Sequence, residues 1–333
     1  MTHGGIGLDK LSMVLQSSEK SLGDKKRFLT TKRRRSLKEN LVLYAIMSPV
    51  LVHIFIFCYV PMYGVVIAFQ NYFPGSSFLA FDGSIQWVGL EHFKNFINSI
   101  YFVRLMKNTL VLSGLQLALG FWVPIVFALL LNEIRHIKYK KIVQTASYLP
   151  HFISMVVVAS MALLMVSQDG LINIILKAIG LEQINYSIDS RHFPKVYVLT
   201  NIWKSFGWNS IIYLSTISSI DPSLYEAAKM DGASRLQRAT RITIPSIQST
   251  IIILLIFAVG GLLNANTEFI LLMYNPAIYE TSDVIGTYVY RQGILQGNFS
   301  QATAIGIFMQ GINFALLYIC NMVARKVNGY SLW

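Results

Sequence analysis

The feature that most restricts the fold of this chain is a series of long apolar segments separated by polar ones. Hydrophobic residues make up 54% of the 333 residues, and the mean hydropathy is +0.51, far from the composition of soluble globular domains. A helix of about 20 apolar residues crosses a membrane core about 30 Å thick. We therefore predict an all-α membrane protein with six spanning helices, at residues 41–69, 108–131, 142–166, 196–220, 247–273 and 302–323.

The excess of positive charge falls on one side of these predicted helices. Residues 1–40, the connections at 132–141 and 221–245 and the C-terminal end carry 20 of the 28 Lys and Arg residues but only 8 of the 16 acidic residues. The remaining residues balance, so this face accounts for the net charge of +12. Cytoplasmic connections are enriched in Lys and Arg, which predicts that both termini are cytoplasmic.

Residues 1–40 show no sustained apolar periodicity and end in a basic run. We predict a mostly disordered cytoplasmic tail whose basic end lies at anionic lipid headgroups. A nucleic-acid-binding tail is the alternative for such a run. The tail also lacks the short apolar region and cleavage site of a secretory signal.

The polar segment at residues 221–245 lies between the fourth and fifth predicted helices. Asp221 is suited to cap a helix whose first residue is a proline, because proline has no N–H to leave unpaired there. Gly232 can end this helix, since glycine adopts left-handed backbone conformations at little cost. Ser234 and Gln237 have the spacing of a capping box for a second short helix. The segment therefore predicts a compact helical turn on the cytoplasmic face.

The order of residues in this segment resembles the EAA loop of the permeases of bacterial ABC importers. It begins with Glu226 followed by two alanines, and Gly232 stands six residues after the glutamate. Ile244 replaces the usual leucine, and Ala239 stands where an aromatic residue is common. In that family the loop is the coupling helix that docks into the cytoplasmic ATPase. The residues that the resemblance assigns to coupling are Glu226, Ala227, Ala228, Asp231, Gly232, Ala233, Ile242 and Pro245.

Two further phrases resemble the carbohydrate branch of these permeases. The sequence WVGLEHF at residues 87–93 is similar to a loop of sugar-importer permeases, and LPHFIS at residues 149–154 resembles a branch that handles complex oligosaccharides, including alginate oligosaccharides. The resemblance implies the type I ABC importer permease fold, with a transmembrane permease domain over residues 41–325. It implies an inner-membrane subunit that forms half of the path for a sugar or oligosaccharide.

The resemblance also implies partners and places the chemistry outside this chain. A second, different permease, two ABC ATPase subunits and an extracytoplasmic solute-binding protein are expected, together with membrane lipid. The chain has no phosphate-binding loop of the GxxxxGK[ST] type, so ATP and Mg are expected in the partner ATPase and no cofactor here. Cys58 and Cys320 lie in apolar segments and the His residues lack ligand spacing, so we predict neither a metal site nor an enzyme.

Polar residues recur at helical spacing in the fourth and fifth predicted helices. A charged side chain at the bilayer centre costs about 2.5–3.5 kcal/mol on insertion scales, so such groups face protein or water. We expect a substrate path in which amides bind sugar hydroxyls and aromatic rings stack on sugar faces. The predicted path residues are Trp203, Lys204, Trp208, Asn209, Tyr213, Asn264, Asn266 and Glu268.

Other interpretations of these polar residues remain open. Lys204 and Glu268 fall at similar predicted depths, so a structural ion pair with hydrogen bonds between helices is one alternative. An anionic uronate would instead require Lys204 free and Glu268 neutralised. For the whole chain, the alternative is an ion-driven secondary carrier for a polar small solute, although the sequence shows no convincing internal duplication. A structural membrane adaptor is disfavoured by the polar lining of two helices.

Overall fold

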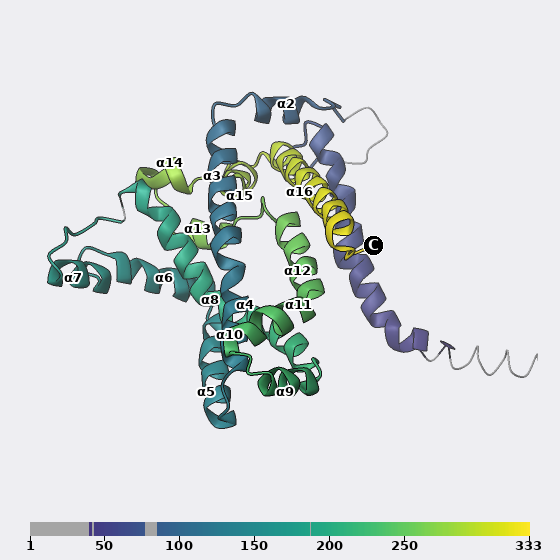
Figure 1. Cartoon of the computed structure of the whole chain (residues 1–333). Coiled ribbons are helices and arrows are strands. Elements are labelled where there is room, and N and C mark those ends of the chain that lie inside the picture. The colour runs from purple at the N-terminus through teal and green to yellow at the C-terminus, as the bar shows by residue number, and fades with distance from the viewer. Residues whose placement is uncertain (1–39, 42, 77–84, 187) are drawn as a thin grey trace, which may run out of the picture. The chain divides into compact units, whose positions relative to one another are not determined.

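The regular elements of this protein are helical (Figure 1). The structure, a computed structural model, describes residues 40–41, 43–76, 85–186 and 188–333. Within these ranges the strand-like pairing is an isolated antiparallel bridge between Gln70 and Trp87. The predicted all-α class is therefore confirmed, whereas most of the predicted tail lies outside the described residues.

The chain divides into two compact units, Met1–Val65 and Val66–Trp333. The helix Leu43–Phe69 crosses their boundary and is not uniformly α-helical. It changes to a π-helical turn, η1 (Phe55–Tyr59), and then to a 3-10 stretch, η2 (Val60–Phe69). Pro61 accounts for this change, because a proline inside a helix lacks the N–H that the carbonyl four residues earlier requires.

The second unit contains the remaining helices. Its first half consists of α2 (Glu91–Ile97), α3 (Phe102–Leu115), η3 (Gln116–Gly120), α4 (Trp122–Asn132), α5 (Ile137–Tyr148), η4 (Leu149–Phe152), α6 (Met155–Val166), α7 (Leu171–Ala178), η5 (Ser190–His192) and α8 (Phe193–Ser218). Its second half consists of α9 (Pro222–Met230), α10 (Arg235–Arg238), η6 (Ala239–Thr243), α11 (Ile244–Ser246), α12 (Gln248–Gly260), α13 (Thr267–Met273), η7 (Pro276–Ile278), α14 (Tyr279–Ser282), α15 (Ile285–Tyr290), η8 (Arg291–Leu295) and α16 (Phe299–Asn328).

Four helical stretches among the described residues are long and apolar enough to cross a membrane: Leu43–Phe69, Phe102–Asn132, Met155–Ala178 and Phe299–Val327. A fifth is obtained when Arg235–Ser246 and Gln248–Gly260, which meet at a bend of 66°, are counted as one span. Helix α8 is long enough but does not qualify, because its many polar side chains lower its hydropathy.

Two helices expected to be continuous are interrupted. The stretch expected at 142–166 ends as η4 and restarts as α6, with Ser154 as the N-cap of the new helix. Pro150 lies in this interruption, which we call the elbow (residues 149–154). The stretch expected at 247–273 stops at Gly260 and restarts at Thr267. We call residues 261–266 the break.

The core of the second unit forms around α8. Helix α4 packs against α8, and α12 packs against α16. Buried side chains of α6, α8 and α13 meet in one cluster, which includes Val158, Tyr197 and Phe269. Another cluster joins α4 to the following half of α8 through Leu131 and Ile217. The helix with the most polar residues is thus held between apolar neighbours on more than one side.

Candidate functional site

The predicted helical turn after α8 is present at α9 and α10, near the lower edge of Figure 1. The Asp221 carboxylate accepts from the Ser223 backbone N–H at 2.9 Å, and this contact lowers the pKa of Asp221. Gly232 has φ +74°, the left-handed conformation expected of it. Ser234 and Gln237 form the reciprocal capping box. The local signals in this segment are therefore confirmed.

Contacts tie this segment to the end of α4. The Glu133 carboxylate lies 3.6 Å from Arg235 Nε and 3.5 Å from Arg238 Nη2. The Tyr225 hydroxyl is 2.9 Å from that of Thr243. Of the predicted coupling residues, Ala228, Ala233 and Ile242 are half-buried and the others are exposed, namely Glu226, Ala227, Asp231, Gly232 and Pro245. The segment is anchored on one side and open on the other.

A polar cavity of about 220 Å³ lies between α3, η3, α8 and the end of α12. Its polar lining consists chiefly of amides and hydroxyls, from Ser113, Gln116, Ser205, Asn209 and Asn264. A second cavity of about 210 Å³ shares Gly120, Phe121, Asn209 and Ala258 with the first and is more apolar, with Pro124, Ile212, Tyr213 and Leu254. The two are neighbours along α8, and we call them together the α8 cavity.

Two polar atoms in the α8 cavity have unused hydrogen-bonding capacity. Ser113 Oγ and Gln116 Oε1 are both buried and have no hydrogen-bond partner among the described residues. A buried polar atom without a partner costs about 1–3 kcal/mol of desolvation, so such atoms are expected to be satisfied by water or a ligand. The cavity is thus able to accept a molecule that carries hydroxyl groups.

Distant side chains stabilise the break beside this cavity. Asn313 of α16 accepts from the Leu263 N–H at 3.0 Å and donates to Asn264 Oδ1 at 3.2 Å. Asn266 caps α13 by accepting from Phe269 N–H at 3.2 Å. Irregular backbone within a membrane is tolerated where protein buries it or where it lines a cavity. Leu263 and Ala265 of the break are buried, and Gly261, Leu262 and Asn264 line the α8 cavity.

Helix α8 completes the support of the break. The Asn266 N–H donates to the Tyr197 hydroxyl at 2.8 Å, and its side-chain Nδ2 donates to Asn201 Oδ1 at 2.7 Å. Asn266, expected to bind sugar, therefore uses these groups to join α13 to α8. Of the other predicted path residues, Asn209, Tyr213 and Asn264 line the α8 cavity, whereas Trp203 does not.

The ion pair considered between Lys204 and Glu268 is absent from the described structure. Lys204 Nζ instead donates to the carbonyls of Pro150, His151 and Ile153 in the elbow, at 2.5 to 3.3 Å. An ammonium supplies three donors, one for each of these carbonyls, and the Pro150 carbonyl also accepts from the Ile153 N–H at 3.2 Å. Glu268 is exposed and makes no hydrogen bond or ion pair with described residues.

Trp208 also contacts the elbow and not the cavity. Its ring stacks on His151 with centroids 4.5 Å apart and an interplanar angle of 2°, and Phe152 meets it edge-on at 5.4 Å. A Cβ at Gly207 would approach the Ser147 carbonyl to 2.1 Å, so only glycine permits this packing of α8 on α5. One face of α8 thus packs against the elbow, while another lines the α8 cavity.

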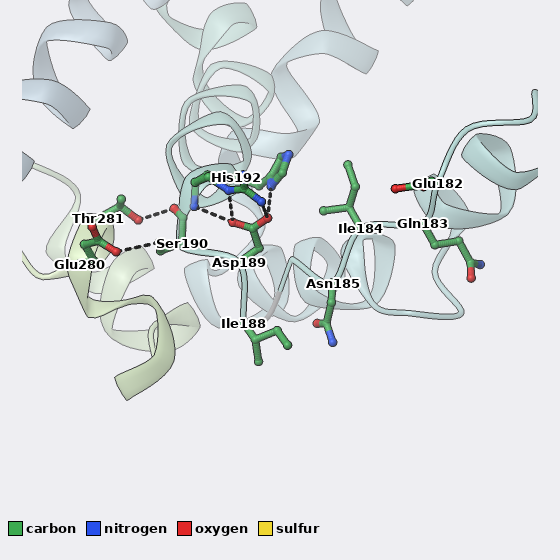
Figure 2. Close-up of a pocket in the computed structure, with 11 residues that line it drawn as sticks. Glu182, Gln183, Ile184, Asn185, Ile188, Asp189, Ser190, His192, Glu280 and Thr281 are labelled. Carbon is green, nitrogen blue, oxygen red and sulfur yellow. Dashed lines mark hydrogen bonds and ion pairs between the residues drawn. The ribbon is translucent and has the colours of Figure 1, made fainter.

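A larger polar pocket, of about 710 Å³, lies before the start of α8 (Figure 2). Ser190 Oγ donates to Glu280 Oε2 at 3.3 Å, and Thr281 Oγ1 donates to the Ser190 carbonyl. The Arg191 side chain hydrogen-bonds Asp189 and holds the pKa of that carboxyl well below its usual range. These contacts join the connection before α8 to α14.

Sequence reasoning missed Ser113, Gln116 and Asn313. The first two follow Thr109 at intervals of four and three residues, so the polar face of the second predicted helix was visible as a helical period. Asn313 follows Gln310 by three residues in α16, so a polar face was visible there too, but not which residues it contacts. Its partners are about 50 residues away in sequence, and no local signal indicates them.

Comparisons of the sequence and of the structure with known proteins point to the same family. Residues 120–329 match the family model described as binding-protein-dependent transport system inner membrane component. The chain is 44% identical over 303 residues to the polygalacturonan/rhamnogalacturonan transport system permease protein YteP of Bacillus subtilis (strain 168), covering 90% of this chain and 93% of that protein. It is 40% identical to a chain in the crystal structure of a bacterial ABC transporter involved in the import of the acidic polysaccharide alginate, with a TM-score of 0.79.

That match covers 88% of this chain and 98% of the other. A second crystal structure, of a bacterial alginate ABC transporter in complex with an alginate pentasaccharide-bound periplasmic protein, matches over 90% and 99% of the two chains, with the same identity and TM-score. At 40% identity over most of both chains, the likeness is one of sequence as well as of fold. The protein described here belongs to the family of inner membrane components of binding-protein-dependent transport systems.

Proposed function

We propose that this chain is a transmembrane permease subunit of an ABC importer for acidic oligosaccharides, and that the α8 cavity is its part of the substrate path. The observation that carries the proposal is the α8 cavity itself, in which amide and hydroxyl groups border a break in a helix. Discontinuous helices with exposed polar backbone mark substrate sites in other membrane transporters. The named substrates of the relatives, polygalacturonan/rhamnogalacturonan and alginate, favour an acidic sugar.

The lining of the α8 cavity suits a sugar ring. Ser113, Gln116 and Asn209 offer donors and acceptors to hydroxyl groups, while Phe121 and Tyr213 in the adjoining part offer ring faces to C–H surfaces. Asn264 is partly engaged with Asn313, so it presents only its remaining polar capacity. The cavities are small, so a second permease would supply the facing half of the path.

The topology that we propose keeps six crossings with both termini cytoplasmic. The distribution of Lys and Arg supports it, because α9, α10 and the connection after α4 share the basic face with the tail. Helix α8 crosses in spite of its low hydropathy, with the Lys204 ammonium hydrogen-bonded to three carbonyls of the elbow. Segments α12 and α13 form one crossing with a break, as the amide contacts from α8 and α16 allow.

The proposed assembly contains a second, different permease, two ABC ATPase subunits and an extracytoplasmic binding protein. ATP and Mg belong to the ATPase, which docks on the exposed side of α9 and α10. Glu226 and Asp231 lie on that exposed side. Glu133, bound to Arg235 and Arg238, transmits the movement to α4. Family membership argues against the ion-driven carrier considered from the sequence.

A co-purification followed by a transport assay tests this proposal. The tagged chain, purified in mild detergent with its co-expressed neighbours, is expected to retain an ATPase with phosphate-binding loops. Reconstituted in liposomes with binding protein, the complex is expected to import an oligogalacturonate or oligoalginate at the expense of ATP. Recovery of the chain alone, or uptake driven by an ion gradient without ATP, would refute the assignment.

Variants of the cavity test the path. Gln116→Leu and Asn209→Leu are each expected to lower uptake by about tenfold, which corresponds to about 1.4 kcal/mol of lost sugar contacts. Leu199→Ala on an exposed face of α8 is the matched control and is expected to transport normally. If both cavity variants assemble and import at the rate of the control, the path lies elsewhere.

A further inference from the structure

We propose that Arg104 and Arg291, together with neighbouring tyrosines, form a site that binds the carboxylate of an acidic sugar before it reaches the α8 cavity. The inference rests on the proposed function and names the group that this part of the permease recognises. Arg104 lies near the start of α3, and Arg291 follows α15. In Figure 1 this end of α3, close to α14 and α15, lies opposite α9 and α10.

The two arginines carry more positive charge than their buried partner neutralises. Asp283 is fully buried and lies 3.2 Å from Arg104 Nη2 and 2.9 Å from Arg291 Nη2. Arg291 Nη1 and the Thr287 hydroxyl donate to its other oxygen, at 3.3 and 2.8 Å. One carboxylate therefore meets two guanidinium groups, and one positive charge is left over.

Arg104 holds most of the unused capacity. Its hydrogen bond to Asp283 uses one of five guanidinium N–H donors, and the described residues provide no other acceptor for it; the Nε atom is buried, so the donors left for a ligand are those of the two terminal nitrogens. The side chain of Arg104 is 36% exposed, compared with 21% for Arg291. A planar guanidinium with free donors is the group that binds carboxylates in a bidentate manner.

Aromatic rings surround these arginines. The guanidinium of Arg104 lies 5.4 Å from the Tyr101 ring centroid, and that of Arg291 lies 5.5 Å from Tyr279 and 5.4 Å from Tyr288. Tyr101 is 39% exposed. A sugar acid combines a carboxylate with an apolar C–H face, and this combination of guanidinium and exposed ring matches both.

The α8 cavity offers no comparable anion site. Its lining residues are uncharged, and the nearest cation considered from the sequence, Lys204, is already bound by three elbow carbonyls. The charge of the sugar is therefore met outside the part of the cavity that this chain lines. Among the described residues, the Arg104 and Arg291 pair is a partly exposed cationic group with surplus charge at one end of the helix that lines the cavity.

The geometry keeps this site in a fixed position above the cavity. Asn108 Nδ2 donates to the carbonyls of Glu280 and Asp283, at 2.9 Å each, and Thr109 Oγ1 accepts from the Ile285 N–H at 3.0 Å. Helix α3 is thereby joined to α14 and α15. Ser113 stands nine residues after Arg104 on the same helix, which is about 14 Å along its axis. At 3.6 residues per turn the two side chains leave α3 on opposite faces, so they are successive contacts for a moving sugar and not one combined site.

Direct binding of two matched sugars tests the site. The purified permease–ATPase complex, without binding protein, is titrated with an oligogalacturonate and with its uncharged methyl ester. The wild type is expected to bind the acid more tightly, and Arg104→Gln to reduce this preference about tenfold while binding of the ester is unchanged. Arg191→Gln, at another exposed arginine in an ion pair, is the control and is expected to keep the preference.

Arg104→Lys keeps a positive charge beside Asp283 but not the planar fork, so it serves if the glutamine variant fails to assemble. It is expected to lose a smaller part of the preference. An equal preference in the wild type and in either assembled Arg104 variant overturns the inference, as does a wild type that binds acid and ester alike. These outcomes leave the proposed function intact, provided that the full transporter imports an oligosaccharide; absence of any import refutes the proposed function itself.

Discussion

Two irregular parts of the second unit, the turn between α9 and α10 and the break between α12 and α13, are stabilised in different ways. In the turn, Gly232 supplies a left-handed residue and its N–H donates to the Lys229 carbonyl at 3.1 Å. The cap of the next helix comes from Ser234 and Gln237. Every one of these partners lies within a few residues of its acceptor or donor.

The break has one local cap, from Asn266, but also depends on distant partners. Its backbone is held by Asn313 from α16 and by Tyr197 from α8, which are 50 and 69 residues from their partners. The comparison indicates that local caps are sufficient to stabilise the solvent-exposed turn between α9 and α10. The break draws partners from other helices, as irregular backbone requires where protein buries it or where it lines a cavity. Four experiments test this difference, in order of decreasing expected effect.

Asn313→Leu is expected to have the largest effect, since it removes both contacts of α16 with the break. The Leu263 N–H and the Asn264 side chain lose their partners at a position that is only 3% exposed. We expect a loss of about 2–4 kcal/mol in stability, measured by thermal unfolding of the purified chain in detergent. Gln310→Leu, exposed on the same helix, is the control. Equal melting of the two variants would show that the break needs no distant support.

Gly232→Leu is expected to leave the fold intact and to impair coupling. A leucine at φ +74° is strained, although a Cβ would meet open space there. We expect uptake to fall about tenfold at an unchanged level of ATP hydrolysis, measured in the same proteoliposomes. Gly232→Asn, which tolerates this conformation, is expected to transport nearly normally. Glu226→Lys should uncouple in the same way, and normal transport by both Gly232→Leu and Glu226→Lys would contradict the coupling role.

The pair formed by Asn266 and Asn201 allows the distant contribution to be measured alone. Asn266→Ala removes the side-chain cap of α13 and the bond to Asn201, whereas Asn201→Ala leaves the cap and removes that bond together with its own hydrogen bond to the Tyr197 carbonyl within α8. A double-mutant cycle on thermal stability is expected to give a coupling energy of about 1 kcal/mol. A coupling energy near zero would mean that the local cap alone maintains the break.

Ser234→Ala is expected to have the smallest effect. It removes one local hydrogen bond in an exposed helix of four residues. Faster hydrogen exchange at the Gln237 amide is expected, with no change in the melting of the membrane helices. Global destabilisation by this variant would mean that the turn is not the independent local unit described above.

The same contrast explains how far the sequence predicted the structure. The caps at Asp221 and Ser234 and the turn at Gly232 were predictable, because their partners are neighbours in sequence. The apolar segments located most helices, but hydropathy averaged across the break concealed it. Lys204 and Glu268 were predicted to line the substrate path, with an ion pair between them as one alternative, whereas carbonyls of the elbow bind the lysine. Every residue has a backbone carbonyl, so the sequence does not indicate which of them accept hydrogen bonds from Lys204.

The contact between Lys204 and the elbow has a consequence for biogenesis. Its three carbonyl acceptors precede Lys204 by 51 to 54 residues, so they are synthesised before α8 leaves the ribosome. In the proposed topology α8 is too polar to partition into lipid alone. It can then insert beside the elbow, whose carbonyls are already in place to hydrogen-bond the Lys204 ammonium. Substitutions that remodel the elbow are therefore expected to be recognised by quality-control proteases as failures of insertion, before the importer has assembled.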